Sequence, residues 1–312
     1  MNDEVATASG RPGAIVAEEA RPSQEVRSLW REGLGRLLSN KLAIVGMVIV
    51  GVVILSALFA PLLATQHPDS NGIFNAYPKE NKLPPSWEHP MGTDDLGRDI
   101  LSLILYGSRV SLLVGVVSVG LAIVIGSFLG AVAGFMGGRS DSWIMRLMDI
   151  LLAFPGILLA LVIVILVGPG LFNAMVAVGI VSIPIYARIA RASVLGEVGK
   201  DYVLAARSMG ASSARLLLGH IAPNALSALI VAASLGIATA ILDAAALGFL
   251  GLGAQPPTPE WGLMLSRNKS HMFTSPWMVF FPGAAIMFLV LGFNLLGDGL
   301  RDALDPRLAR RA

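Results

Sequence analysis

The longest uncharged stretch of the chain decides its fold class. Residues 150–187 read ILLAFPGILLALVIVILVGPGLFNAMVAVGIVSIPIYA, which is 38 residues in a row without a charged side chain. A helix needs about 20 apolar residues to cross roughly 30 Å of hydrocarbon, so the stretch is long enough for two spans. Gly168-Pro169-Gly170 is typical of a tight turn and divides it in two.

The composition of the whole chain agrees with a membrane protein. Of its 312 residues, 54% are hydrophobic and only 14% are charged, against about 25% charged in an ordinary globular domain. A soluble fold of this length could not bury so much apolar surface, so lipid must be the solvent for part of it. The sequence predicts an all-α integral membrane protein with six transmembrane helices, at about 42–64, 110–136, 148–167, 172–190, 225–249 and 277–297.

The Lys and Arg residues set the expected orientation, because cytoplasmic loops carry an excess of them. With a cytoplasmic N-terminus, the inside segments hold 17 of the 23 Lys and Arg residues and the outside segments hold 6. We therefore expect both termini inside. The inside segments are 1–41, 137–147, 188–224 and 298–312, and the outside segments are 65–109 and 250–276.

Two cytoplasmic tails flank the predicted membrane domain, 41–297. Residues 1–40 are polar and are predicted to be partly disordered, and residues 298–312 form the second tail. The first apolar run comes too late and is too long for a signal peptide, whose apolar region has about 7–15 residues. We interpret it as an uncleaved first span.

Small residues and prolines mark particular helices. Gly126, Gly130 and Gly134 recur at a spacing of four in the second predicted span, which lets another backbone approach closely, either within this chain or at a subunit interface. Pro155 and Pro184 each remove a backbone donor and kink a helix. Such kinks suit a moving gate, but they also occur in static membrane helices.

Asp243 is the exception among the charged residues, because it lies well inside the fifth predicted span. An ionisable residue in a span is costly and is by default a functional hypothesis. Asp243 is therefore our candidate for the substrate path. The alternatives are a position in the outer interface or a pairing with an Arg of a partner chain.

The chain lacks the sequence signals of an energy source. Lys269 is the only Lys followed by Ser or Thr, and Asn268 precedes it where a phosphate-binding loop needs Gly. The chain has no Cys, its four His are scattered, and no catalytic grouping occurs, so we predict neither a catalytic nor a metal site. A stand-alone ion-coupled carrier, the less favoured alternative, usually needs acids or histidines deep in its spans.

Residues 188–224, the longest internal inside loop, are predicted to form two short helices. Asp201 can cap the first and Gly210 can take the positive φ that ends it. Ser212 or Ser213 can cap the second. Such a helical knob could seat in a groove of another protein, although a solvated loop with ordinary helix punctuation has the same composition.

Within this loop, Ala205 and Ala206 are expected to offer a small, smooth face. The stretch resembles the EAA loop of ABC importer permeases, which docks onto the ATPase subunit. It matches the family pattern at both alanines, at Gly210 and at Pro223, and it departs at Leu204, where the family's Glu often sits. The resemblance implies an ATPase-coupling loop that includes Tyr202, Ala205, Ala206, Arg207, Gly210, Ala211, Arg215, His220 and Pro223.

Three further stretches, 89–99, 248–262 and 293–306, resemble the C-type subunit of the dipeptide/oligopeptide/nickel group of permeases, and residues 241–262 are nearest to its dipeptide members. The likeness covers about residues 40–307 and implies a type I ABC importer permease fold in a bacterial inner membrane. The implied substrate is a dipeptide or short oligopeptide, with glutathione or a nickel complex as the alternative.

The resemblance also implies partners. These are a homologous B-type permease, two ABC ATPase subunits, an extracytoplasmic peptide-binding protein that meets the outer loops, and the lipid bilayer. The ATPase subunits would bind ATP and Mg²⁺, and we expect this chain to bind no cofactor, no metal and no nucleic acid.

Overall fold

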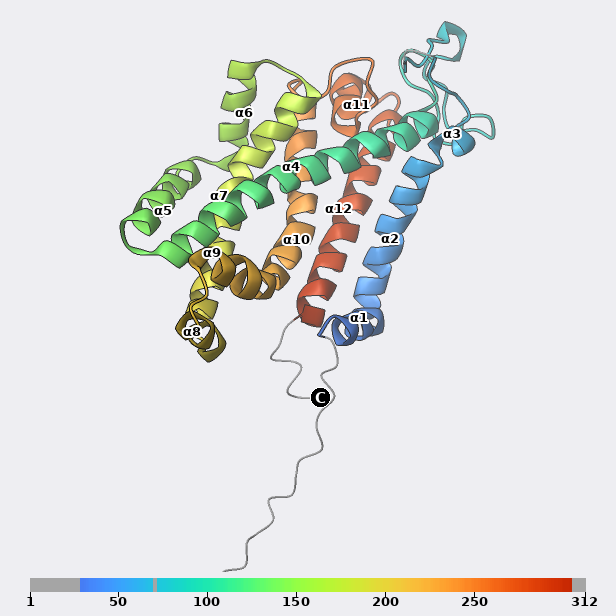
Figure 1. Cartoon of the computed structure of the whole chain (residues 1–312). Coiled ribbons are helices and arrows are strands. Elements are labelled where there is room, and N and C mark those ends of the chain that lie inside the picture. The colour runs from blue at the N-terminus through green and yellow to red at the C-terminus, as the bar shows by residue number, and fades with distance from the viewer. Residues whose placement is uncertain (1–28, 70–71, 305–312) are drawn as a thin grey trace, which may run out of the picture.

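A computed structural model describes residues 29–69 and 72–304, and these residues form a bundle of long helices (Figure 1). Five of the described helices are long and apolar enough to cross a membrane, and a bent pair of shorter helices makes a sixth candidate. The chain is thus a multi-pass membrane protein. The predicted disorder of residues 1–28 and the last part of the second tail, residues 305–312, lie outside the described residues.

The described elements follow one another in this order: α1 (Leu29–Ser39), α2 (Lys41–Leu58), α3 (Ala60–Leu63), η1 (Pro78–Glu80), α4 (Ile100–Met136), α5 (Gly138–Leu152), α6 (Gly156–Val167), α7 (Leu171–Val198), α8 (Asp201–Ser208), α9 (Ser213–Arg215), η2 (Leu216–Ile221), α10 (Ala222–Phe249), α11 (Trp261–Asn268), η3 (Lys269–His271) and α12 (Trp277–Leu304). Several of them extend beyond the predicted spans. The second span begins at Ile100 rather than at 110, and α7 runs on to Val198, into the predicted coupling loop.

The most extensive contact between described helices joins α4 to α7. Gly126, Gly130 and Gly134 lie against the carbonyl oxygens of Ile183, Ala187 and Arg191, and a Cβ added at these glycines would lie 2.7, 2.1 and 2.9 Å from those oxygens. Any residue larger than glycine at these three positions would prevent the two backbones from approaching so closely. The glycine stripe therefore packs within this chain, the first of the two alternatives that its spacing allows.

Because residue numbers rise together along this contact, α4 and α7 run parallel, and the chain between them must return to the starting end. The return is made by α5 and α6, which meet at an angle of 88°. Pro155 lies at the break, directly before α6, so it ends a helix instead of kinking a continuous span at 148–167. Pro184, in contrast, lies inside α7.

Two ends of the bundle can be told apart in Figure 1. At one end, the α8 end, lie α1, α8, α9 and the last turns of α12, and at the other, the α11 end, lie α3 and α11. Asn40 donates a hydrogen bond from Nδ2 to Asp302 Oδ2 (3.3 Å), which joins the start of α2 to the end of α12. Both ends of the described chain thus lie at the α8 end.

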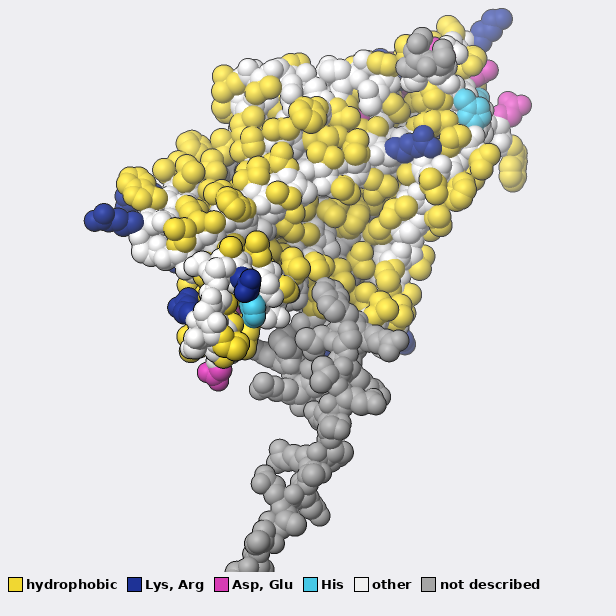
Figure 2. Space-filling view, viewed as in Figure 1, with side chains coloured by type: hydrophobic (Ala, Val, Ile, Leu, Met, Phe, Trp, Pro, Cys, Tyr) yellow, Lys and Arg dark blue, Asp and Glu magenta, His cyan; other side chains and the backbone are white. Residues whose placement is uncertain are grey.

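The surface between the two ends is apolar (Figure 2). On α2, Val48, Val52, Leu55 and Leu58 are each more than half exposed, and Leu166 on α6 is 81% exposed. Water would make such exposure costly, whereas lipid tails or a partner's apolar face would not.

We predict that Gly130→Ala lowers the melting temperature of the purified protein, because the new methyl group meets the backbone of Ala187 and not a flexible side chain. Overpacking of this kind costs about 1–3 kcal/mol. Gly120→Ala is the matched control on the same helix, since a Cβ there meets nothing within 4 Å. A melting temperature for Gly130→Ala equal to that of Gly120→Ala would contradict the contact.

Candidate coupling surface and transport path

The predicted coupling loop folds as a short helix, a turn and a second helix that continues into α10. Asp201 lies in the first turn of α8, where its charge suits the helix dipole, but Lys200 occupies the cap position and no side chain caps this helix. Gly210 has a φ of +84°, and Ala211 N donates to Ala206 O (3.1 Å), which closes the end of α8. Ser212 caps α9 by accepting from Arg215 N at 3.4 Å.

The two alanines of this loop do not share one surface, contrary to the prediction. Ala206 is buried against Val194, Leu216 and Ile221. Ala205 is exposed, since it is one residue, or about 100° of helix rotation, away from its buried neighbour. The apolar residues of this loop that are exposed are Leu204, Ala205, Met209 and Leu218.

The structure brings the remaining predicted coupling residues to the same end of the bundle. Arg207 and Arg215 are exposed, Ala211 is half-buried, and Pro223 lies in the first turn of α10. The backbone of Arg215 is tied to the next turn, because its carbonyl oxygen lies 3.2 Å from His220 Nδ1.

Asp243 lies far from this loop, near the opposite end of α10. Twenty helical residues separate it from Pro223, or about 30 Å of helix rise. Its side chain is half-buried, and Asp243 forms no hydrogen bond or ion pair with any residue that the structure describes. No Arg among the described residues pairs with Asp243, and the alternative of an Arg from a partner chain stays a prediction.

The face of α10 that carries Asp243 differs from the lipid-like surface of α2. Ala232, Thr239, Asp243 and Ala246 share this face at helical spacing, and each is exposed or half-exposed. They are small or polar, whereas the exposed residues of α2 are large and aliphatic. A lipid-facing helix gains little from small and polar side chains, so this face of α10 suits a protein partner or water better than lipid tails.

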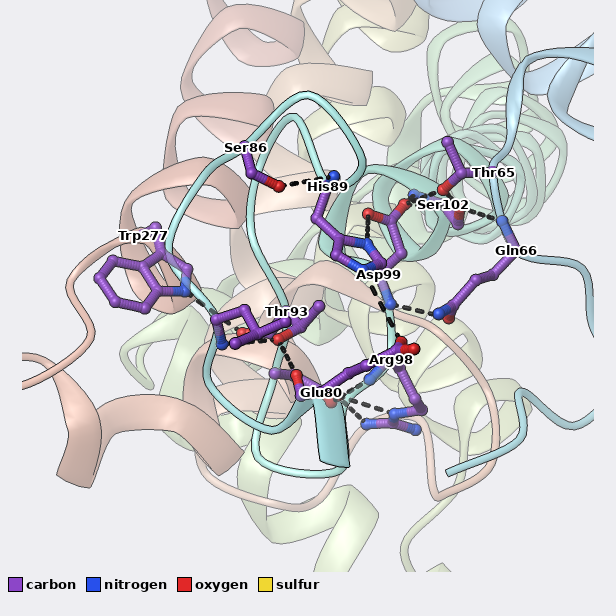
Figure 3. Close-up of polar contacts among 12 residues, drawn as sticks. Thr65, Gln66, Glu80, Ser86, His89, Thr93, Arg98, Asp99, Ser102 and Trp277 are labelled. Carbon is purple, nitrogen blue, oxygen red and sulfur yellow. Dashed lines mark hydrogen bonds and ion pairs between the residues drawn. The ribbon is translucent and has the colours of Figure 1, made fainter. Parts of the chain in front are cut away.

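The loop at the α11 end is organised around a fully buried carboxylate (Figure 3). Asp99 caps α4, and its Oδ2 accepts from Thr65 Oγ1 (2.7 Å), Ser102 N (2.8 Å) and Ser102 Oγ (2.7 Å). Its Oδ1 lies 3.2 Å from His89 Nδ1. This cluster was not predicted from the sequence, although an Asp three residues before Ser102 at the start of a long apolar run is a capping signal.

A second carboxylate closes the turn that precedes Asp99. Asp94 accepts from the backbone N–H groups of Leu96 and Arg98, both at 2.9 Å, and pairs with the Arg98 guanidinium at 2.5 Å. Trp277, at the start of α12, donates from Nε1 to Thr93 O at 3.2 Å (Figure 3). The 89–99 stretch is therefore fixed to both α4 and α12.

The segment before α11 carries another buried acid. Glu260 caps α11 by accepting from Gly262 N (2.8 Å) and Leu263 N (2.7 Å), and it is 5% exposed. Burial raises the pKa of the Glu260 carboxyl above its ordinary value, and the two backbone hydrogen bonds act in the opposite direction. The neighbouring Trp261 is buried and donates from Nε1 to Ile104 O at 3.2 Å, which holds α11 on α4.

Comparison with known proteins assigns the family. Residues 122–310 match the family model described as the binding-protein-dependent transport system inner membrane component, and residues 28–85 match the N-terminal transmembrane domain of oligopeptide transport permease C. The chain belongs to this family of transport permeases. The expected membership in the dipeptide and oligopeptide group is thereby confirmed.

Individual relatives cover nearly the whole chain. The dipeptide transport system permease protein DppC of Alkalihalophilus pseudofirmus is 50% identical over 281 residues, which is 90% of this chain and 91% of that protein. The glutathione transport system permease protein GsiD of Pectobacterium atrosepticum is 46% identical over 285 residues, covering 91% and 93%.

A solved structure confirms the fold class. A chain of the MetNI methionine ABC transporter in an inward-facing conformation superposes with a TM-score of 0.55, covering 65% of this chain and 96% of that one at 21% sequence identity. The chain therefore has the predicted type I ABC importer permease fold. Among residues 29–69 and 72–304, no group of three or more His, Cys, Asp or Glu residues could hold a metal ion.

We predict that Asp99→Ala destabilises the protein by about 2 kcal/mol or more, because it removes a helix cap and leaves buried donors without an acceptor. The melting temperature of the purified protein measures the change. Glu88→Ala is the control, since Glu88 is an exposed acid in the same loop. If both variants melt at the same temperature, Asp99 does not organise the loop.

We predict a pH-dependent effect for Glu260→Gln. Because the raised pKa means that the folded state binds the proton more tightly than the unfolded state, the contribution of Glu260 to stability falls as the pH rises through its folded pKa. Glutamine keeps an oxygen for the two N–H groups but does not titrate. The melting temperature of the variant relative to the parent should therefore rise from about pH 4 to about pH 8, and a difference independent of pH would contradict this account.

Proposed function

We propose that this chain is a permease subunit of an ATP-driven importer of dipeptides or short oligopeptides, that it forms half of the transport path, and that separate subunits hydrolyse ATP. The relative at 50% identity over 90% of the chain, a dipeptide permease by name, supports the substrate class. The glutathione permease at 46% identity supports glutathione, itself a short peptide, as the second candidate.

The continuity of α10 carries this proposal. This helix has Pro223 in its first turn, beside the coupling loop, and it holds Asp243, which no described residue pairs with, about 30 Å away near the other end of the bundle. A helix of this length is stiff, so a displacement at the α8 end moves the Asp243 end with it. A single rigid helix between the contact with the ATPase and the transport path suits an energy-coupled transporter.

The α8 end is the proposed seat of the two ATPase subunits. Leu204, Ala205, Met209 and Leu218 are exposed, Arg207 and Arg215 lie near them in the sequence, and in this proposal the four apolar residues form one docking patch. Burial of such a patch in a groove of another protein is favourable by about 25 cal/mol per Å². In this proposal the ATPase subunits bind ATP and Mg²⁺, and this chain binds no cofactor.

The Asp243 face of α10 is the proposed boundary of the path. A homologous B-type permease would face it and close the other half. A carboxylate without a partner at this depth is costly and gains most from a cation, and the ammonium group of a peptide is such a cation. Asp243 is thus proposed to attract the amino terminus of the incoming peptide.

The proposed orientation places the α8 end in the cytoplasm of a bacterial cell, with both termini there. The Lys and Arg excess of the inside segments supports it, as does the position of α1, α8 and the end of α12 at the same end. The α11 end would then face an extracytoplasmic peptide-binding protein across the inner membrane. The tightly hydrogen-bonded 89–99 loop suits such a docking surface, because rigid loops lose little entropy on binding.

The uptake of a labelled dipeptide, in cells with and without the gene for this chain, tests the function. We expect uptake to be lost on deletion and restored by the gene on a plasmid. Unlabelled dipeptide, tripeptide, glutathione and a nickel complex serve as competitors. Competition by glutathione alone would move the assignment to the second candidate, and competition by none of the peptides would contradict a peptide substrate.

We predict that Asp243→Asn raises the KM for a dipeptide about tenfold, which corresponds to the loss of about 1.4 kcal/mol of binding. An N-acetylated dipeptide has no ammonium group, so its poorer uptake should not change further. Thr239→Ala is the control on the same face, since it removes a polar group but no charge. Unchanged uptake of several peptides by Asp243→Asn would contradict a role in the path.

A further inference from the structure

A chain of polar contacts crosses the coupling loop. Lys200 Nζ lies 2.6 Å from Glu197 Oε1, and the Tyr202 hydroxyl donates to Glu197 Oε2 at 2.5 Å. From the other side, Asn224 Nδ2 donates to the Tyr202 hydroxyl at 2.9 Å and to His220 O at 3.1 Å. These contacts join the end of α7, the start of α8, the end of η2 and the first turn of α10.

The hydroxyl of Tyr202 is the centre of this chain of contacts. It has one hydrogen to donate, and the short contact to the Glu197 carboxylate uses it, because His220 O lies farther away at 3.4 Å. The lone pairs of the hydroxyl then accept from Asn224. The amide of Asn224 has two hydrogens, one for Tyr202 and one for His220.

Two glycines flank α8, and glycine restricts its backbone less than any other residue does. Gly199 lies before the helix and Gly210 after it, and a Cβ at either position would meet nothing within 4 Å. Beneath α8, Val203 and Ala206 pack on the neighbouring helices. Such apolar contact is non-directional, so it holds the helix down without fixing its direction.

The contacts also cross an irregular turn that lies directly before α10. Residues 216–221 form a π-helical turn, two residues before Pro223. Proline has no N–H to donate, and its ring clashes with the carbonyl four residues earlier, so a widened turn relieves the clash. Asn224 bonds back to His220 across this turn and so connects the regular part of α10 to the loop.

We propose that Tyr202 is a positioning residue, whose hydroxyl fixes α8 to α7 and to α10 so that a push on α8 moves α10 and not α8 alone. The inference rests on the proposed function. In this proposal the hydroxyl of Tyr202 fixes the orientation of α8, whereas the apolar contacts of Val203 and Ala206 hold α8 on the bundle.

The test uses the complete importer, purified with its second permease and ATPase subunits and reconstituted in liposomes with its binding protein. Import of a labelled dipeptide and ATP hydrolysis are measured together. Tyr202→Phe keeps the ring and removes only the hydroxyl. We expect the number of peptides imported per ATP hydrolysed to fall about fivefold, in line with one lost hydrogen bond.

Two further variants separate positioning from general damage. Asn224→Ala removes the other half of the link and should lower the same ratio, and the double variant should lower it no further than the larger single effect. Ser212→Ala removes a cap in the same loop that does not connect α8 to α10, and it should leave the ratio unchanged.

The outcomes distinguish this inference from the proposed function. If the unchanged importer moves no peptide, the proposed function is contradicted. If the unchanged importer works, an unaltered ratio in Tyr202→Phe overturns only the role of the hydroxyl, as does an additive double variant. Should Tyr202→Phe fail to assemble, Asn224→Ala, which retains Tyr202, gives the deciding ratio.

Discussion

The close approach of α4 and α7 is the contact on which the rest of the architecture depends. Three glycines on α4 face three carbonyl oxygens of α7 at backbone distance, and the two helices run parallel. Parallel neighbours in one chain require a return crossing, and α5 and α6 supply it. The bend between them, at Pro155, lets α5 pack on α4 and α7 before α6 completes the crossing.

Different parts of the bundle surface suit different surroundings, either lipid or a protein partner and water. Large aliphatic side chains on α2 suit lipid, whereas the small and polar face of α10 gains little from lipid and carries the Asp243 carboxylate, which has no partner in the described part of the chain. At the two ends, polar groups are paired closely instead. The buried acids Asp99 and Glu260 each cap a helix, so the loops at the α11 end are rigid although they contain little regular structure.

The two ends of the molecule are joined by single helices and not by a chain of side-chain contacts. This matters for a transporter, because a stiff helix transmits displacement over its whole length while a loop absorbs it. A displacement can be absorbed where two helices meet. In this chain such joints lie beside α8, at Gly199 and Gly210, and in the widened turn before Pro223. The hydroxyl of Tyr202 and the amide of Asn224 lie between these joints.

Sequence alone was sufficient where the signal lies within a few neighbouring residues. Uncharged length predicted the spans, the glycine spacing predicted a close helix contact, and Gly210 was recognised as a helix end from its residue type. Each of these depends on local backbone geometry or on the transfer of a segment into lipid.

Tertiary structure decided what depends on a partner distant in the chain. Which of the adjacent alanines 205 and 206 is buried depends on where α7 and α10 lie, and the predicted shared face was wrong for that reason. Likewise, only the packed helices bring Asn224 to Tyr202, and only they leave Asp243 without an ion pair among the residues that the structure describes. Residue type and spacing describe one helix at a time, whereas burial and pairing are properties of several.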